Sequence, residues 1–185
     1  HEEDKMGIRT SNTCDVVLED CRIPASNLIG AEGQGFSIAM KTLDQARAWM
    51  GCIATGIAQR GMEEAIAYGK ERIQFGKPVL KNQALQFKIA DMAIKIETAR
   101  QMVAHALTLM DLGLPYSKES AIAKCYASDI AMEVASEAIQ MFGGYGYSRE
   151  YPVEKLLRDA KIFQIFEGTN EIQRIVVANN TIGRF

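Results

Sequence analysis

The stretch NQALQFKIADMAIKIETARQMVAHALTLMDL, residues 82–112, decides the fold of this chain. Its apolar residues recur at alternating steps of four and three, and the resulting stripe comprises Leu85, Ile89, Met92, Ile96, Ala99, Val103 and Ala106. Such a heptad-like stripe is typical of a long amphipathic helix that packs in a helical bundle. Gly113 and Pro115 follow directly and predict the end of the helix near Leu112.

A long helix is also predicted before this stretch, over residues 36–70. The segment lacks proline, and its apolar residues are spaced mostly by three and four: Ala39, Leu43, Ala46, Met50, Ile53, Ala54, Ile57, Met62 and Ile66. Gly51, Gly56 and Gly61 lower its intrinsic helix propensity, but they allow another helix to approach closely. Residues 72–78 are expected to break the helix.

A third long helix is predicted over residues 117–142, ending at Gly143 and Gly144. One face of it is lined by Ile122, Tyr126, Ile130, Val134, Ala138 and Phe142. Shorter helices are expected over residues 153–165 and 170–181. Three long amphipathic helices with shorter ones predict an all-α fold, a helical bundle.

Residues 1–32 have a different character from the helical part. Residues 14–24 are strand-like and end at Pro24, and glycines at 30, 33 and 35 mark a loop. One strand cannot form a sheet by itself, so this one is expected to stay unpaired unless it docks on another element. The sequence therefore divides into residues 1–32 and a helical domain over residues 33–185.

Composition excludes several function classes. A formal net charge of −2 without a clustered basic patch argues against nucleic-acid binding. No apolar run approaches the roughly 20 residues that span a bilayer, so no membrane partner is expected. No signal peptide is visible, and because the chain begins at His1 we expect it to be cut from a longer protein.

The cysteine and histidine content argues against metal sites. Cys14, Cys21, Cys52 and Cys125 form no Cys-x-x-Cys pair, and buried free thiols are expected, which suits a reducing compartment. With only His1 and His105 present, neither a histidine-based metal site nor a Ser-His-Asp triad is expected.

The stretch QIFEGTNEIQR, residues 164–174, carries the strongest chemical signal. Gly168 allows a tight turn, and Thr169 can cap the helix that follows. Glu167 would then lie at a turn beside apolar side chains, where poorer solvation makes a carboxylate a stronger base. By itself, Glu-Gly-Thr is better explained by a solvated glutamate at a helix start, because functional carboxylates with a perturbed pKa are a minority.

Four further motifs occur in order around this stretch: ERIQFGKP, QMFGGYG, YPVEK and RDAKI, which begin at residues 71, 140, 151 and 158. Together with residues 164–174, this set resembles the C-terminal half of the acyl-CoA dehydrogenases. The resemblance covers nearly the whole chain from about Lys5, and it is strongest to the short-chain, butyryl-CoA type. It implies that residues 1–32 are the end of the central β domain and its linker, and that residues 33–185 are the C-terminal helical domain.

The resemblance implies that Glu167 abstracts the α-proton of an acyl-CoA while a hydride leaves the β-carbon for N5 of FAD, giving a trans-2-enoyl-CoA. Charge that develops on the thioester oxygen must be stabilised. The implied donors are the backbone N–H of Glu167 and a ribityl hydroxyl of FAD, which makes the cofactor part of the catalytic site. Gly168 is implied to contact the substrate.

An Asp-x-x-Arg element, residues 44–47, tests this assignment. Some relatives place the base immediately before its arginine, but that residue here is Ala46, which cannot accept a proton. This departure favours Glu167 and argues against the isovaleryl and long-chain types. Asp44 and Arg47 are implied to hold the carrier arm of CoA, although on spacing alone they would be an exposed helical charge pair.

Several motif residues match positions that contact FAD in the family. Arg72 and Gln74 resemble residues that reach its ADP portion across a subunit interface, and an arginine fork suits a pyrophosphate. The other implied FAD contacts are Phe75, Asn82, Gln83, Gln140, Met141, Phe142, Gly143, Gly144, Thr169 and Glu171. Helix termination, capping and dipole effects explain many of these residues without a cofactor.

Three functions therefore remain open for the chain. The first is the C-terminal part of an FAD-dependent short-chain acyl-CoA dehydrogenase, with electron-transfer flavoprotein as the acceptor. The second is a related acyl-CoA oxidase, and the third is an inactive helical oligomerisation domain. Family members are commonly tetramers, so a dimer or tetramer is expected, and the isolated 185 residues are expected to be inactive. The bacterial cytoplasm and the mitochondrial matrix both fit.

Overall fold

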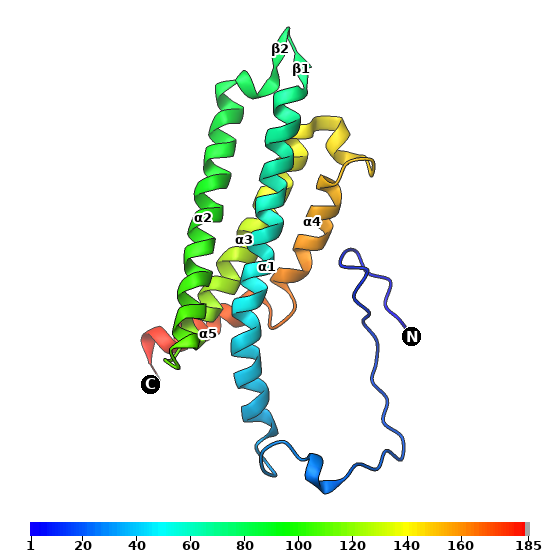
Figure 1. Ribbon diagram of the computed structural model, residues 1–185, viewed down its shortest axis with the longest axis vertical. Helices are drawn as coiled ribbons and strands as arrows, with labels where there is room; N and C mark the ends of the chain where they lie inside the picture. The colour runs from blue at the N-terminus through cyan, green and yellow to red at the C-terminus, as the bar shows by residue number, and fades with distance from the viewer. Residues whose placement is uncertain (184–185) are drawn as a thin grey trace.

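The computed structural model describes residues 1–183, which contain three long helices that alternate in direction (Figure 1). They are α1 (Gly35–Glu71), α2 (Gln83–Asp111) and α3 (Ser117–Phe142). Two shorter helices, α4 (Val153–Lys161) and α5 (Asn170–Ile182), pack against α3. The predicted helical bundle is confirmed, and each long helix lies within two residues of its predicted bounds.

The predicted helix over residues 153–165 is shorter than expected. The α-helix ends at Lys161, and a 3-10 turn over Ile162–Gln164 follows it. Phe166 N–H still donates to the carbonyl of Ile162 at 2.9 Å, which tightens the chain before the Glu167 turn.

The core centres on α3, which packs against the other four α-helices. The predicted apolar stripe of α2 is confirmed: its residues from Met92 to Ala106 are buried, and Leu85 and Ile89 pack against them. The core face of α3 is rich in alanine, so neighbouring helices can approach it closely. Side chains of α3 can therefore contact each of the other four α-helices.

The face that α1 buries matches the predicted stripe only in part: Ala54 is buried, and Met50, Ile57 and Met62 pack against the core. Ile53 and Ala39 are exposed, while the buried face consists mainly of small residues: Ala48, Gly51, Ala54, Thr55, Ala58, Gly61, Ala65 and Gly69. A Cβ on Gly51 would lie 3.0 Å from Val103 Cγ2, so this glycine does permit close approach. Gly56 was wrongly assigned that role, because a Cβ there would meet nothing within 4 Å.

Residues 72–78 form a tight hairpin that was not predicted. Strands β1 (Ile73–Gln74) and β2 (Lys77–Pro78) pair antiparallel, with Ile73 opposite Pro78. Phe75 and Gly76 both have positive φ, as a two-residue type I′ turn requires. The hairpin lies at one end of the bundle, where it connects α1 to α2 (Figure 1).

Residues 14–24 do not form a strand, and the segment stays unpaired, as expected for one strand-like segment without a partner. Apart from an isolated bridge between Glu2 and Cys14, the segment has no pairing, and Val16, Val17 and Leu18 are 71% to 84% exposed. Within residues 1–183, no neighbouring strand is present to satisfy its backbone groups. Residues 6–8 instead dock on α4, where Ile8 N–H donates to Asp159 Oδ1 at 2.7 Å.

The prediction of buried cysteines was also wrong. Cys14, Cys21 and Cys52 are exposed, and Cys125 is half-buried. Cys14 and Cys21 lie in the unpaired N-terminal segment, and Cys52 lies on the outward face of α1. Over residues 1–183, no helix is both long and apolar enough to cross a membrane, and no group of three or more potential ligands is arranged to hold a metal ion.

Candidate functional site

Glu167 lies in a strained turn between the 3-10 segment and α5. It has a φ of +56°, and Gly168 follows with a φ of +88°, so two successive residues adopt left-handed backbone conformations. A non-glycine residue rarely adopts this conformation unless the surrounding structure holds it there. As predicted, Thr169 caps α5, with its hydroxyl oxygen accepting from the N–H of Ile172.

Two buried side chains hold the backbone of this turn. Gln173 Nε2 donates to the carbonyl of Glu167 at 3.1 Å and to that of Gly168 at 2.8 Å. Lys124 Nζ, from α3, donates to the carbonyl of Gly168 at 2.9 Å. Both Lys124 and Gln173 are 0% exposed. The turn is therefore fixed from α3 on one side and from its own following helix on the other.

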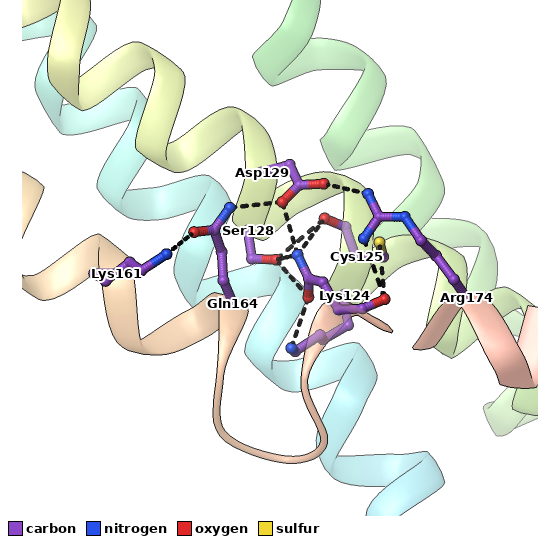
Figure 2. A network of polar contacts seen from close by, with 8 residues as sticks. Lys124, Cys125, Ser128, Asp129, Lys161, Gln164 and Arg174 are labelled. Atoms are coloured by element: carbon purple, nitrogen blue, oxygen red, sulfur yellow. Dashed lines mark hydrogen bonds and ion pairs between the residues drawn. The ribbon is translucent and has the colours of Figure 1, made fainter. Parts of the chain in front are cut away.

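Asn170 joins this turn to a wider polar network that includes Lys124, Ser128 and Asp129 of α3, which Figure 2 labels. Its Oδ1 accepts from Lys124 at 2.8 Å, while its Nδ2 donates to Ser128 Oγ and to Asp129 Oδ1, each at 2.8 Å. Asp129 also accepts from Gln164 at 2.7 Å and from Arg174 at 2.9 Å. These contacts fix which way the Asn170 amide faces, so that its oxygen meets the ammonium.

Burial lowers the pKa of Lys124 from 10.5 to about 8. Desolvation disfavours the charged form and is the dominant cause. The other charged and titratable groups that act on this ammonium are Cys125, Asp129, Arg47 and Glu171. Cys125, Asp129 and Glu171 raise the pKa, whereas the positive charge of Arg47 lowers it further.

Asp44 and Arg47 lie on α1 near this network. Arg47 is only 6% exposed and donates to Asp44 Oδ1 at 2.5 Å, so the reading of an exposed charge pair is wrong. Both residues line a cavity of about 600 Å³ between α1, the start of α3 and α5. Because the Arg47 charge influences Lys124, this cavity and the Glu167 turn lie at the same end of the bundle.

Three buried side-chain atoms in residues 1–183 have no hydrogen-bond partner: Arg47 Nε, Ser120 Oγ and Gln173 Oε1. Ser120 lies one helical turn before Lys124 on α3, and Gln173 holds the Glu167 turn. Unpaired buried polar atoms are uncommon in native proteins and are costly unless a ligand or water satisfies them. Their position favours this end of the bundle as a ligand-binding region.

A second cavity, of about 620 Å³, lies at the hairpin end of the bundle. Seven of the predicted FAD contacts line it: Arg72, Gln74, Gln140, Met141, Phe142, Gly143 and Gly144. The guanidinium of Arg72 lies 5.2 Å from the centroid of the Tyr145 ring, a cation–π contact that orients it. Gly143 ends α3 with a φ of +63°, and a Cβ on it or on Gly144 would meet only open space.

The other predicted FAD contacts do not join this cavity. Phe75 is 98% exposed at the tip of the hairpin. Asn82 and Gln83 lie at the start of α2, where Asn82 Nδ2 donates to the carbonyl of Val79.

Thr169 and Glu171 line a third cavity of about 420 Å³ beside Asp129 and Arg174. The backbone N–H of Glu171 itself, followed by the Thr169 hydroxyl, lowers the pKa of the Glu171 carboxyl. The predicted site residues therefore form separate groups, one at the hairpin end of the bundle and the others near α5. Within one chain they do not form a single site.

Comparison with known proteins decides the family. Residues 33–182 match the family model described as acyl-CoA dehydrogenase, C-terminal domain. The chain belongs to the acyl-CoA dehydrogenase family. It is 53% identical over 174 residues to a short-chain specific acyl-CoA dehydrogenase of Megasphaera elsdenii, covering 94% of this chain and 45% of the relative.

Solved structures agree with this assignment. The butyryl-CoA dehydrogenase of Megasphaera elsdenii superposes with a TM-score of 0.97 at 50% identity, covering 98% of this chain and 48% of that one. A chain in the structure of the electron transferring flavoprotein of Acidaminococcus fermentans gives a TM-score of 0.98 at 52% identity, covering 100% of this chain and 48% of that one. The chain thus spans about half the length of the relatives that it matches.

In this acyl-CoA dehydrogenase chain, sequence reasoning missed the residues that hold the Glu167 turn. The sequence patterns assigned no role to Lys124 of α3 or to Asn170 and Gln173 of α5. One signal was available: Lys124 lies between the buried positions Ala123 and Ala127 of an alanine-rich face. A lysine on such a face is rarely buried unless it is paired.

Proposed function

We propose that this chain is the C-terminal part of an FAD-dependent short-chain acyl-CoA dehydrogenase in which Glu167 removes the α-proton of the substrate. The observation that carries the proposal is the Glu167–Gly168 turn, in which a carboxylate-bearing residue is held in a left-handed conformation by two fully buried donors. Such strain is maintained mainly where it serves a site. The identity to short-chain relatives supports the substrate class.

The residues of this chain have distinct roles in the proposed reaction. Glu167 accepts the α-proton, and its backbone N–H donates to the thioester oxygen as negative charge develops there. Asp44 and Arg47 hold the carrier arm of CoA in the cavity that they line. The unpaired Nε of the buried Arg47 supports this role, since an acceptor on a ligand would satisfy it.

The cavity at the hairpin end fits the diphosphate part of FAD. Arg72 supplies a planar fork of donors, Gln74 and Gln140 supply amides, and the open space at Gly143 and Gly144 lets a ligand approach the backbone closely. FAD, when bound, supplies the two-electron acceptor for the hydride that leaves the β-carbon. Because this cavity lies at the opposite end of the bundle from Glu167, we propose that it serves the FAD of a neighbouring subunit.

A homo-oligomer, a dimer or tetramer, follows from that arrangement. The outward face of α2 supports it, because Phe87 and Ile94 there are 60% and 63% exposed. Exposed apolar side chains of this size favour association when they form a patch. Electron-transfer flavoprotein is the proposed electron acceptor. The match to a chain in the structure of the electron transferring flavoprotein of Acidaminococcus fermentans supports it.

The proposal is tested by Glu167→Gln in the full-length protein, because glutamine keeps the size and hydrogen bonding of the side chain but cannot accept the proton. Reduction of bound flavin by butyryl-CoA, followed by stopped-flow absorbance, should slow by at least about 10³-fold. FAD content should stay near that of the wild type, which serves as the control for folding. Near-normal reduction by the variant would disprove the assignment of Glu167.

A further inference from the structure

Lys124 is an unusual buried charge. Its side chain is fully buried, and its two hydrogen-bond acceptors among the described residues are neutral: the carbonyl of Gly168 and Oδ1 of Asn170. Burying an ammonium without a hydrogen-bonded carboxylate is costly, and such a group is weak evidence for a purely stabilising role. The ammonium donates to the carbonyl of Gly168, the residue that follows Glu167, and this position points to a role in holding Glu167.

The turn needs an external constraint. The left-handed conformation of Glu167 is unfavourable for a residue with a Cβ, and the cap at Thr169 fixes only the backbone that follows it. Lys124 and Gln173 both donate to the carbonyl of Gly168, so one oxygen is held from two directions. Losing either donor would let the peptide between Gly168 and Thr169 rotate, and Glu167 would move with it.

The hydrogen bonds that Lys124 makes are themselves supported by further contacts on α3. Asn170 presents its oxygen to Lys124 because its nitrogen donates to Ser128 and Asp129, which lie one turn further along α3 (Figure 2). Ser128 Oγ also donates to the carbonyl of Cys125, so the hydroxyl is anchored to the helix backbone. The acceptors of the Lys124 ammonium thus lie in the turn and at the start of α5, and Lys124 ties both of them to α3 in the bundle core.

We propose that Lys124 is a positioning residue for the reaction, one that fixes the Glu167–Gly168 turn so that the Glu167 carboxylate and backbone N–H are aligned with the reacting atoms of the acyl thioester. This inference rests on the proposed function of Glu167. Lys124 is fully buried and donates to protein acceptors, so it acts through the backbone of the turn. A general base that is displaced by about 1 Å loses roughly 10²-fold in rate.

The test uses Lys124→Met in the full-length, FAD-loaded protein, because methionine keeps most of the side-chain volume and removes the donors. The limiting rate of flavin reduction by butyryl-CoA should fall by roughly 10- to 100-fold. The KM for butyryl-CoA and the FAD content should change by no more than about twofold, since the contacts to both ligands remain. Hydrogen exchange at the amides of residues 167–169 should accelerate, which reports on the turn independently of activity.

Val134→Ala is the matched control, because Val134 is a buried residue of α3 that lies far from the turn. It should lower the unfolding temperature and leave the limiting rate and the exchange at residues 167–169 unchanged. A role of Lys124 in stability alone predicts that Lys124→Met behaves like this control. That result would overturn the inference.

Ser128→Ala is a second, milder variant that loosens Asn170 without removing a buried cation. It should lower the limiting rate by several-fold, and an unchanged rate would overturn the inference even if Lys124→Met failed to fold. The outcome is separable from that of the proposed function. If Glu167→Gln retains activity, the base is misassigned, whereas loss of activity in Glu167→Gln with a wild-type rate in Lys124→Met refutes only the positioning role.

Discussion

Gly168→Ala should destabilise the chain by more than its backbone conformation alone explains. The φ of +88° costs a residue with a Cβ about 1–2 kcal/mol. The added Cβ would lie 2.9 Å from Gln173 Nε2, which would have to move away. That nitrogen makes two hydrogen bonds to the turn, each with a net value of about 1 kcal/mol. The expected loss in the free energy of unfolding is therefore about 2–4 kcal/mol.

The measurement is urea or thermal unfolding at a fixed protein concentration, because association would otherwise shift the apparent stability. For a chain of this length, the expected loss corresponds to roughly 5–15 °C in the unfolding temperature. Gly113→Ala is the matched control, since Gly113 also has a positive φ, +68°, but a Cβ there would meet nothing within 4 Å. It should lose only the conformational part, about 1–2 kcal/mol. Equal losses in the two variants would refute the contribution of Gln173.

Three further predictions concern the cofactor, the buried lysine and assembly. Arg72→Ala should lower FAD occupancy in the full-length protein. Arg72→Lys should restore it only in part, because an ammonium cannot form the bidentate contact. Full FAD occupancy in the alanine variant would contradict the role of Arg72. Since the Lys124 pKa is lowered to about 8 in the folded state, the unfolded state holds more protons between about pH 8 and 10.5. The stability of the wild type relative to Lys124→Met should then rise with pH across that window, by up to about 1.4 kcal/mol per pH unit, and a flat difference in urea titrations would contradict it. Light scattering should find a dimer or tetramer, and Phe87→Glu with Ile94→Glu should weaken it; a monodisperse wild-type monomer would refute the interface.

The sequence by itself determined the elements whose signals are local. The stripe from Leu85 to Ala106 predicted α2, because its spacing matches the repeat of a packed helix. Gly143 predicted the end of α3, since a residue with φ of +63° there favours glycine. Thr169 was recognised as a cap because its preference comes from an oxygen within reach of a nearby backbone N–H.

Other predictions were wrong, wholly or in part, because they depended on what each segment packs against. The face that α1 buries could be read only in part from apolar spacing, since close approach to α3 selects alanine and glycine at several positions. The strand at residues 14–24 had suitable composition but no partner to pair with. The hairpin at Phe75 was missed because phenylalanine is a weak signal for a position with positive φ.

The candidate site shows the same division between local and tertiary information. The Glu167–Thr169 motif could be found from the sequence, because the glycine and the capping hydroxyl act on their immediate neighbours. The residues that hold the motif in place could not be found in this way. Lys124 lies 44 residues from Gly168, and its local sequence does not indicate which group accepts its hydrogen bond. Only the packing of α3 against α5 buries that ammonium beside the turn, because burial and long-range hydrogen bonds are properties of the assembled bundle.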